Sequence, residues 1–318
     1  MMNENISSAR LGKWLIVAMS GPFAYLAGRQ SWTTILAVSA ICLLALWAVL
    51  ARPTCKLLSM PILCLLEYGF LTAVCVATAS WSSDIWPTGQ GYPVVPLTLL
   101  GLSIASAWFG ANRASKGIGV LFWMIAILYS ILLTFGMRNV KLGYLMPQFE
   151  TPEPVIWFLF LLPLVAQFQP REKDKRISGY MVVLVGLALL FALWTEGNLS
   201  LDAAKQVSWP FYEAGESVHL FGIANRLESL ISVAVTIGFY GLYSLLLSGA
   251  FHLAEELRPG RGKYGVLIAG VLSGAGVLWK VTIPGFVLVV GAFVLWIALP
   301  IFGSLFSKKK RKKTENIA

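Results

Sequence analysis

The residues of this chain best placed to do chemistry are helix-breaking or polar groups inside long apolar stretches. Gly21-Pro22 interrupts a stretch that begins near Leu11, and Pro163 interrupts another that begins near Pro154. Proline inside a helix removes a backbone N–H and clashes with the carbonyl one turn earlier, so we expect both helices to bend or unwind there. Freed backbone groups in a bilayer need protein or a polar cavity to satisfy them. Two such breaks at matching positions therefore predict a solute site between them.

The expected site would hold a zwitterion, because helix N-terminal ends favour a carboxylate and free carbonyls favour an ammonium. Aromatic side chains one or two turns before the second break would form its wall. The predicted ligand-binding residues are Ser20, Gly21, Pro22, Trp157, Phe160 and Pro163. The alternative interpretation is that both breaks are packing kinks and that the aromatic residues belong to an ordinary core.

Charged residues supply a second group of candidates. Glu67 falls near the middle of the stretch 57–80, where an acidic side chain costs about 2.5–3.5 kcal/mol to insert and should face protein or water. It is a candidate proton acceptor or partner for a ligand ammonium, or else a structural carboxyl bonded to a neighbouring helix or to Arg226. Arg226 and Glu228 are two residues apart and do not face each other on a helix. They either gate a charged solute or extend to the membrane surface.

Composition places these residues in a membrane protein. The chain is 57% hydrophobic and 13% charged, with a mean hydropathy of +0.74, which is too apolar for a soluble protein of 318 residues. Its apolar runs are mostly long enough to cross the hydrocarbon core, which needs about 20 residues. We expect ten spans, at 11–28, 33–51, 57–80, 93–110, 118–136, 154–169, 179–195, 225–250, 264–279 and 283–306.

Basic residues predict the orientation. With the N-terminus in the cytoplasm, 19 of the 25 Lys and Arg residues fall in inner segments, including all six of Lys308–Lys313. The positive-inside rule then places both termini in the cytoplasm. Residues 218–257 could form two spans, but that would move the last basic loops outside, so we expect one crossing followed by a cytoplasmic extension.

The expected fold is therefore all-α, with ten transmembrane helices in two five-helix repeats. Repeats with an odd number of spans insert in opposite orientations, which predicts inverted topology. The expected organisation is a cytoplasmic tail 1–10, a permease domain 11–306 with repeats 11–136 and 154–279 and a tenth helix 283–306, and a basic cytoplasmic tail 307–318.

Several short motifs of the chain resemble those of one known family. Ala27-Gly28-Arg29-Gln30-Ser31-Trp32 is similar to an Ala-Gly-x-Asp-Ala-Trp segment, with Gln30 at the position of the Asp, that is typical of spore-germination permeases. These are the B-subunits of endospore germinant receptors, in the amino acid–polyamine–organocation superfamily. Tyr92-Pro93 resembles the Thr-Pro segment that opens the fourth span. Trp209-Pro210 and Arg226-Leu227-Glu228 resemble the lead-in and entrance of the eighth span. The first span is shorter than is usual in the family, and the loop 52–56 lacks its cytoplasmic helix.

This resemblance implies a spore inner-membrane subunit that binds an amino acid or similar small germinant, with A- and C-type receptor subunits as partners. A proton-coupled amino acid transporter is the alternative, with Glu67 carrying the proton.

Other functions receive little support from the sequence. No nucleophile elbow, phosphate loop or catalytic cluster predicts an enzyme, and His219 and His252 stand without metal-ligand spacing, so we expect no cofactor and no metal. The basic tail is expected to set topology and to attract anionic lipid by about 1 kcal/mol per residue. Its residues have no interleaved aromatic groups for stacking bases, so we expect no nucleic-acid partner.

Overall fold

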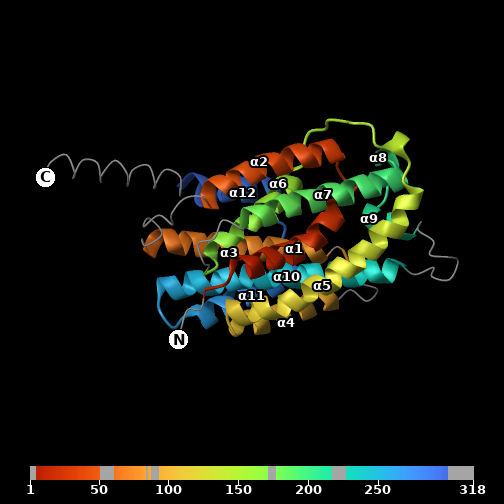
Figure 1. Cartoon of the computed structure of the whole chain (residues 1–318). Helices are drawn as coiled ribbons and strands as arrows, with labels where there is room; N and C mark the ends of the chain where they lie inside the picture. Colours follow the sequence, from red (N-terminus) through yellow and green to blue (C-terminus); the bar gives the residue numbers. More distant parts are fainter. Residues whose placement is uncertain are drawn as a thin grey trace, which may run out of the picture.

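The structure is a computed structural model that describes residues 5–50, 61–83, 85–86, 93–170, 177–216 and 227–299. Within these ranges the regular structure is helical, and the longer helices run roughly along a common axis (Figure 1). The α-helices are α1 Ser8–Leu26, α2 Trp32–Leu50, α3 Pro61–Ser83, α4 Val94–Trp108, α5 Ala111–Gly136, α6 Pro154–Leu161, α7 Ile177–Leu199, α8 Leu201–Ala204, α9 Pro210–Glu216, α10 Leu227–Leu257, α11 Gly262–Leu278 and α12 Gly285–Ala292. Short 3₁₀ segments η2 (Met137–Asn139), η3 (Leu142–Tyr144) and η4 (Leu162–Phe168) and a π-helical segment η5 (Phe293–Ala298) complete them.

The all-α class is confirmed for the described part of the chain, and each expected span overlaps a helix. Four helical stretches are long and apolar enough to cross a membrane: Pro61–Ser83, Ala111–Asn139, Gly179–Leu199 and Ser229–Leu257. Shorter apolar helical stretches accompany them, at Trp32–Ala45, Val94–Trp108, Pro154–Phe168, Gly262–Leu278 and Gly285–Ala298. By length and composition these helices are compatible with a polytopic membrane protein, and the division into two inverted repeats stays a prediction.

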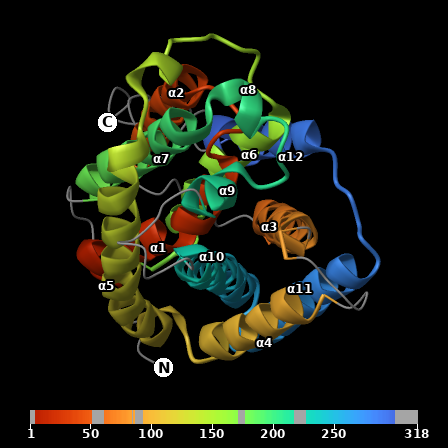
Figure 2. The same cartoon turned by 90° about the vertical axis from the view of Figure 1, so that its right-hand side faces the viewer.

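Helix α10 lies near the middle of the bundle (Figure 2). It runs for 31 residues without interruption, from Leu227 to Leu257, and the expected single crossing with a cytoplasmic extension stays a prediction. Residues 241–250 are all buried. Small residues let neighbours approach closely: a methyl group at Gly241 would lie 2.7 Å from Val17 Cγ1 of α1. The Trp14 indole N–H donates to the Gly241 carbonyl at 3.0 Å, which joins the two helices by a buried hydrogen bond.

The expected break at Gly21-Pro22 is wrong, because α1 runs as one helix through both residues to Leu26. Proline has a φ compatible with a helix, and here its missing N–H falls in the last turns, where one lost bond is tolerated. Gly21 is packed against α10 so closely that a methyl group on Gly238 would lie 2.5 Å from the Gly21 nitrogen. The Gly-Pro pair therefore serves helix packing. The chain leaves the helix further on, at Gly28, whose φ of 80° favours glycine.

The expected interruption of the sixth helix is confirmed. The α-helical turns of α6 end at Leu161, and the chain continues as the 3₁₀ segment η4, with Pro163 in its first turn. A proline near the start of a helical segment loses no bond that the segment needs, which explains the change of helix type at this residue. Gln169 follows with extended backbone and ends the element.

Some expectations fall outside the described residues. These are Arg226, the side chain of Glu228, the loop 52–56, and the tail 307–318.

Candidate functional site

The predicted ligand residues on α1 face α10 more than α6. Ser20 is fully buried, and its hydroxyl donates to the Val17 carbonyl of its own helix at 2.8 Å. Helices α1 and α6 do meet, but through Phe23, whose ring centroid lies 5.3 Å from that of Phe160. The neighbouring Trp157 is partly buried in the same core. The structure thus places Phe160 at a contact between the first and sixth helices, while Gly21 packs against α10 instead.

Glu67 is buried, with 2% of its surface exposed, and its Oε2 atom has no hydrogen-bond partner among the described residues. The residues on either side of Glu67 in α3 show which part of α10 lies at the same level. Cys64 donates from Sγ to the Leu253 carbonyl at 3.4 Å, and Leu71 Cδ2 would lie 3.1 Å from a methyl group on Gly249. Glu67 therefore lies at the level of α10 between residues 249 and 253.

The 3₁₀ half of the sixth helix approaches the same stretch of α10. A methyl group on Gly249 would lie 3.2 Å from Val165 Cγ1 and 3.7 Å from Gln169 Nε2. The Gln169 amide donates to the Leu245 carbonyl at 3.1 Å, while its buried Oε1 has no partner among the described residues. Glu67 and Gln169 thus come from α3 and from the end of η4, two elements that both pack against α10 near Gly249.

Trp296, from the C-terminal part of the chain, also packs against α3 and η4. The ring of Trp296 in η5 packs edge-on against Phe70 of α3 at 5.2 Å and against Phe168 of η4 at 5.7 Å. Its buried N–H has no partner in the described part of the chain. We call Glu67, Gln169 and Trp296 the polar junction.

The polar junction combines two acceptor oxygens and one donor in apolar surroundings. Burying such groups without partners costs roughly 1–3 kcal/mol each on the scale of protein mutations. The Glu67 carboxyl can accept a proton or bind an ammonium group, and the Gln169 Oε1 atom can accept a hydrogen bond from an N–H donor. The sequence analysis predicted Glu67 as a candidate and predicted the change of the sixth helix at Pro163. It gave no indication of Gln169 or Trp296.

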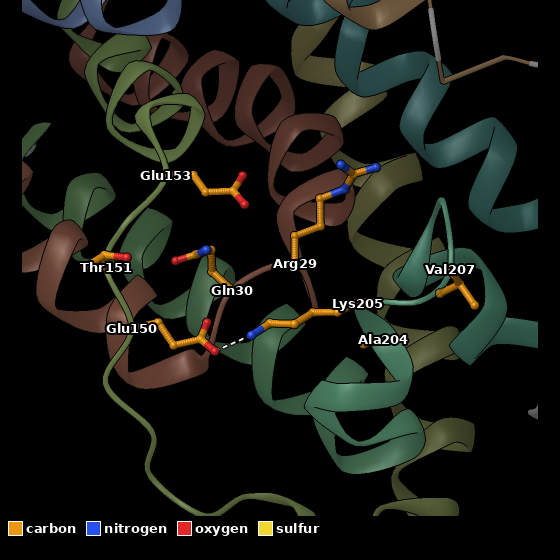
Figure 3. Close-up of a pocket in the computed structure, with 8 residues that line it drawn as sticks. All are labelled: Arg29, Gln30, Glu150, Thr151, Glu153, Ala204, Lys205 and Val207. Carbon is orange, nitrogen blue, oxygen red and sulfur yellow. Dashed lines mark hydrogen bonds and ion pairs between the residues drawn. The ribbon is translucent and has the colours of Figure 1, made fainter.

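A second polar region lies at the opposite end of the bundle, where α1 ends (Figure 3). It is an open hollow with a volume of about 610 Å³. Three segments line it: the turn after α1, the chain before α6, and the end of α8. Its residues are Arg29, Gln30, Glu150, Thr151, Glu153, Ala204, Lys205 and Val207. The sequence analysis found Arg29 and Gln30 within a motif but did not predict the hollow.

Hydrogen bonds to the start of α2 hold these segments in place. The buried Glu196 carboxylate of α7 accepts from the Trp32 backbone N–H at 2.5 Å, and so occupies a free donor of the helix N-terminus. Thr34 accepts from the Glu150 N–H at 3.2 Å, and Thr33 donates to the Gln148 carbonyl. The chain before α6 is thereby fixed against α2.

No protein-family model matches the chain, and no curated protein sequence matches it significantly.

Proposed function

We propose that the protein is a membrane permease-like subunit that binds a small amino acid or similar zwitterion within the bundle. The membrane class is supported by the long apolar helices described above. The observation that carries the binding proposal is the buried Glu67 carboxyl of α3, a helix that packs on the same stretch of α10 as the 3₁₀ half of the sixth helix. Ionisable residues inside membrane bundles are costly to insert and are usually functional, and interrupted helices mark solute sites in transporters.

The resemblance to spore-germination permeases supports a more specific proposal. In it, the chain is the B-type subunit of a germinant receptor in the spore inner membrane, acting with A- and C-type subunits. Its ten spans form two inverted repeats, and both termini are cytoplasmic. Because α1 is continuous, we assign the ligand ammonium to Glu67 and Gln169. Phe160 and Trp157 of α6 keep their proposed role as the aromatic wall of the site.

A proton-coupled transporter is the second candidate, and the position of Glu256 favours it. This carboxyl is exposed on α10, three residues after Leu253, the residue whose carbonyl contacts the turn before Glu67. Residues three apart lie on the same helix face. Glu256 could therefore pass a proton between the aqueous phase and the buried Glu67.

The test is equilibrium binding and flux with purified protein in proteoliposomes, using a panel of radiolabelled amino acids. In Glu67→Gln we expect weaker binding, by about tenfold or more for a lost charge-assisted hydrogen bond, and Glu213→Gln on α9 is the matched control. Binding without flux, together with co-purification of A- and C-type subunits, supports the receptor. Uptake that follows a proton gradient and disappears in Glu67→Gln supports the transporter. Equal binding and flux in Glu67→Gln and Glu213→Gln would contradict both.

A further inference from the structure

We propose that the hollow beyond the end of α1 is a second binding site, which takes a small molecule bearing both an ammonium and a carboxylate group. The proposal rests on the proposed function for the direction of approach, since the hollow then faces the outer aqueous phase. It is separate from the polar junction, because Glu67 lies near the start of α3, whereas the hollow lies beside α8, at the other end of the bundle (Figure 1). A solute arriving from outside would meet the hollow first.

Two acceptor atoms of the hollow provide the site for an ammonium. Gln30 is 4% exposed, and its buried Oε1 has no partner among the described residues. The Glu150 carboxylate forms an ion pair with Lys205 through Oε1, while its buried Oε2 is also without a partner there. Both residues line the same hollow, with Gln30 directed toward the chain that carries Glu150 and Thr151 (Figure 3). A ligand with a positively charged N–H group therefore meets an acceptor side chain on two walls of the hollow.

Arg29 and Lys205 provide the complementary site for a carboxylate. The Arg29 guanidinium is fixed by two contacts: it stacks 4.0 Å from the Tyr25 ring centroid, and its Nη2 donates to the Ser208 carbonyl at 2.5 Å. Its buried Nε–H has no partner in the described part of the chain. Charge-assisted hydrogen bonds from guanidinium to carboxylate are among the strongest in proteins. Lys205 adds a second cation, with its side chain 40% exposed at the rim.

The charge balance of the hollow selects the ligand class. Its lining has two cations, Arg29 and Lys205, and two carboxylates, Glu150 and Glu153. An anionic ligand would lie near the two carboxylates, and a cationic ligand near the two basic groups, in each case with repulsion between like charges. A zwitterion can place each of its charged groups near residues of opposite charge. The volume of about 610 Å³ falls within the usual range of small-molecule sites and leaves room for a ligand larger than glycine.

The site is also preorganised, which lowers the cost of binding. Gly28 has a φ of 80°, and a methyl group there would lie 2.7 Å from both Pro210 Cβ and Thr195 Cγ2. This close packing fixes the turn that carries Arg29 and Gln30. On the opposite wall, the Glu150 backbone N–H is held by Thr34.

The experiment uses the full chain in nanodiscs, in a Glu67→Gln background that weakens binding at the polar junction. Scintillation proximity measures saturable binding of three radiolabelled probes: glycine, L-alanine and glycylglycine. We expect at least one to bind, and acetate and methylamine, each carrying one half of the zwitterion, to compete at least tenfold more weakly. In Gln30→Leu we expect binding to weaken about ten- to a hundredfold through loss of a hydrogen bond to a charged group. Gln206→Leu, exposed and outside the lining, is the matched control and should bind normally.

A second variant keeps the proposal testable if Gln30→Leu fails to fold. Glu150→Gln preserves side-chain volume and leaves Lys205 solvated, and we expect about a tenfold loss of binding, with Asp202→Asn as its control. If Glu67→Gln leaves binding and flux unchanged, the proposed function is refuted. Weaker binding in Gln30→Leu or Glu150→Gln would still support the site in the hollow. The proposal is overturned if none of the three probes binds saturably, or if the variants that fold bind as tightly as their controls. It is also overturned if acetate or methylamine competes as well as glycine.

Discussion

The packing of α1 on α10 leads to a sharp prediction for Gly238→Ala. The added methyl group would lie 2.5 Å from the Gly21 nitrogen, 2.9 Å from its Cα and 2.9 Å from Ser20 Oγ. Unstrained contacts between such atoms need about 3.5 Å, so the two helices have to separate by about 1 Å. Overpacking of this kind costs about 1–3 kcal/mol. At about 2 °C for each kcal/mol in a chain of this size, we expect the Tm to fall by about 2–6 °C.

The matched control is Gly186→Ala in α7, because a methyl group there meets nothing within 4 Å. It measures the gain in helix propensity from glycine to alanine, up to about 1 kcal/mol, without any clash. Tryptophan fluorescence of both detergent-purified variants, heated at the same rate, gives the two Tm values. If Gly238→Ala unfolds at the same temperature as Gly186→Ala, then α1 and α10 are not in contact at Gly21 and the account of a continuous, packed first helix is wrong.

Two further predictions concern buried hydrogen bonds. Replacing Glu196 with alanine leaves the Trp32 N–H unpaired, and we expect the free energy of unfolding to fall by about 1–3 kcal/mol. Glu196→Gln keeps an acceptor and should lose less stability. Chemical denaturation in detergent compares the two variants, and equal losses would contradict the capping role. In Trp14→Phe we expect about 0.5–1.5 kcal/mol less stability from loss of the bond to Gly241, measured the same way; an unchanged unfolding midpoint would show that this bond contributes nothing.

Apolar runs predicted the helices of this chain well, because a segment that must hide its backbone from lipid has few alternatives to a helix. Every expected span overlaps a helix, and the change at Pro163 was expected from proline chemistry alone. The short helices α8 and α9 were not predicted, since segments of four and seven residues carry too little periodicity to detect.

The error at Gly21-Pro22 shows what the sequence could not decide. Glycine followed by proline is equally compatible with an unwound segment and with a close helix contact, and the choice depends on the partner. Here Gly238 on α10 offers a surface without a side chain, so the backbone of α1 approaches it and stays helical. The hollow was hidden for a related reason. Gln30, Glu150 and Lys205 are far apart along the chain, and their approach depends on the turn at Gly28 and the bonds to α2.

The placement of unpaired polar atoms separates the two proposed sites more clearly than their sequence motifs do. At the hollow, Arg29 and Gln30 lie in the turn after α1. At the polar junction, Gln169 donates to the Leu245 carbonyl of α10, and Cys64, one turn before Glu67, donates to the Leu253 carbonyl. Helices α1 and α10 are joined in between by the contact at Gly238 and the bond from Trp14. Close-packed interfaces of this kind move as units rather than deform continuously. Helices α1 and α10 therefore form one packed unit, with one proposed site after the end of α1 and the other beside the C-terminal half of α10.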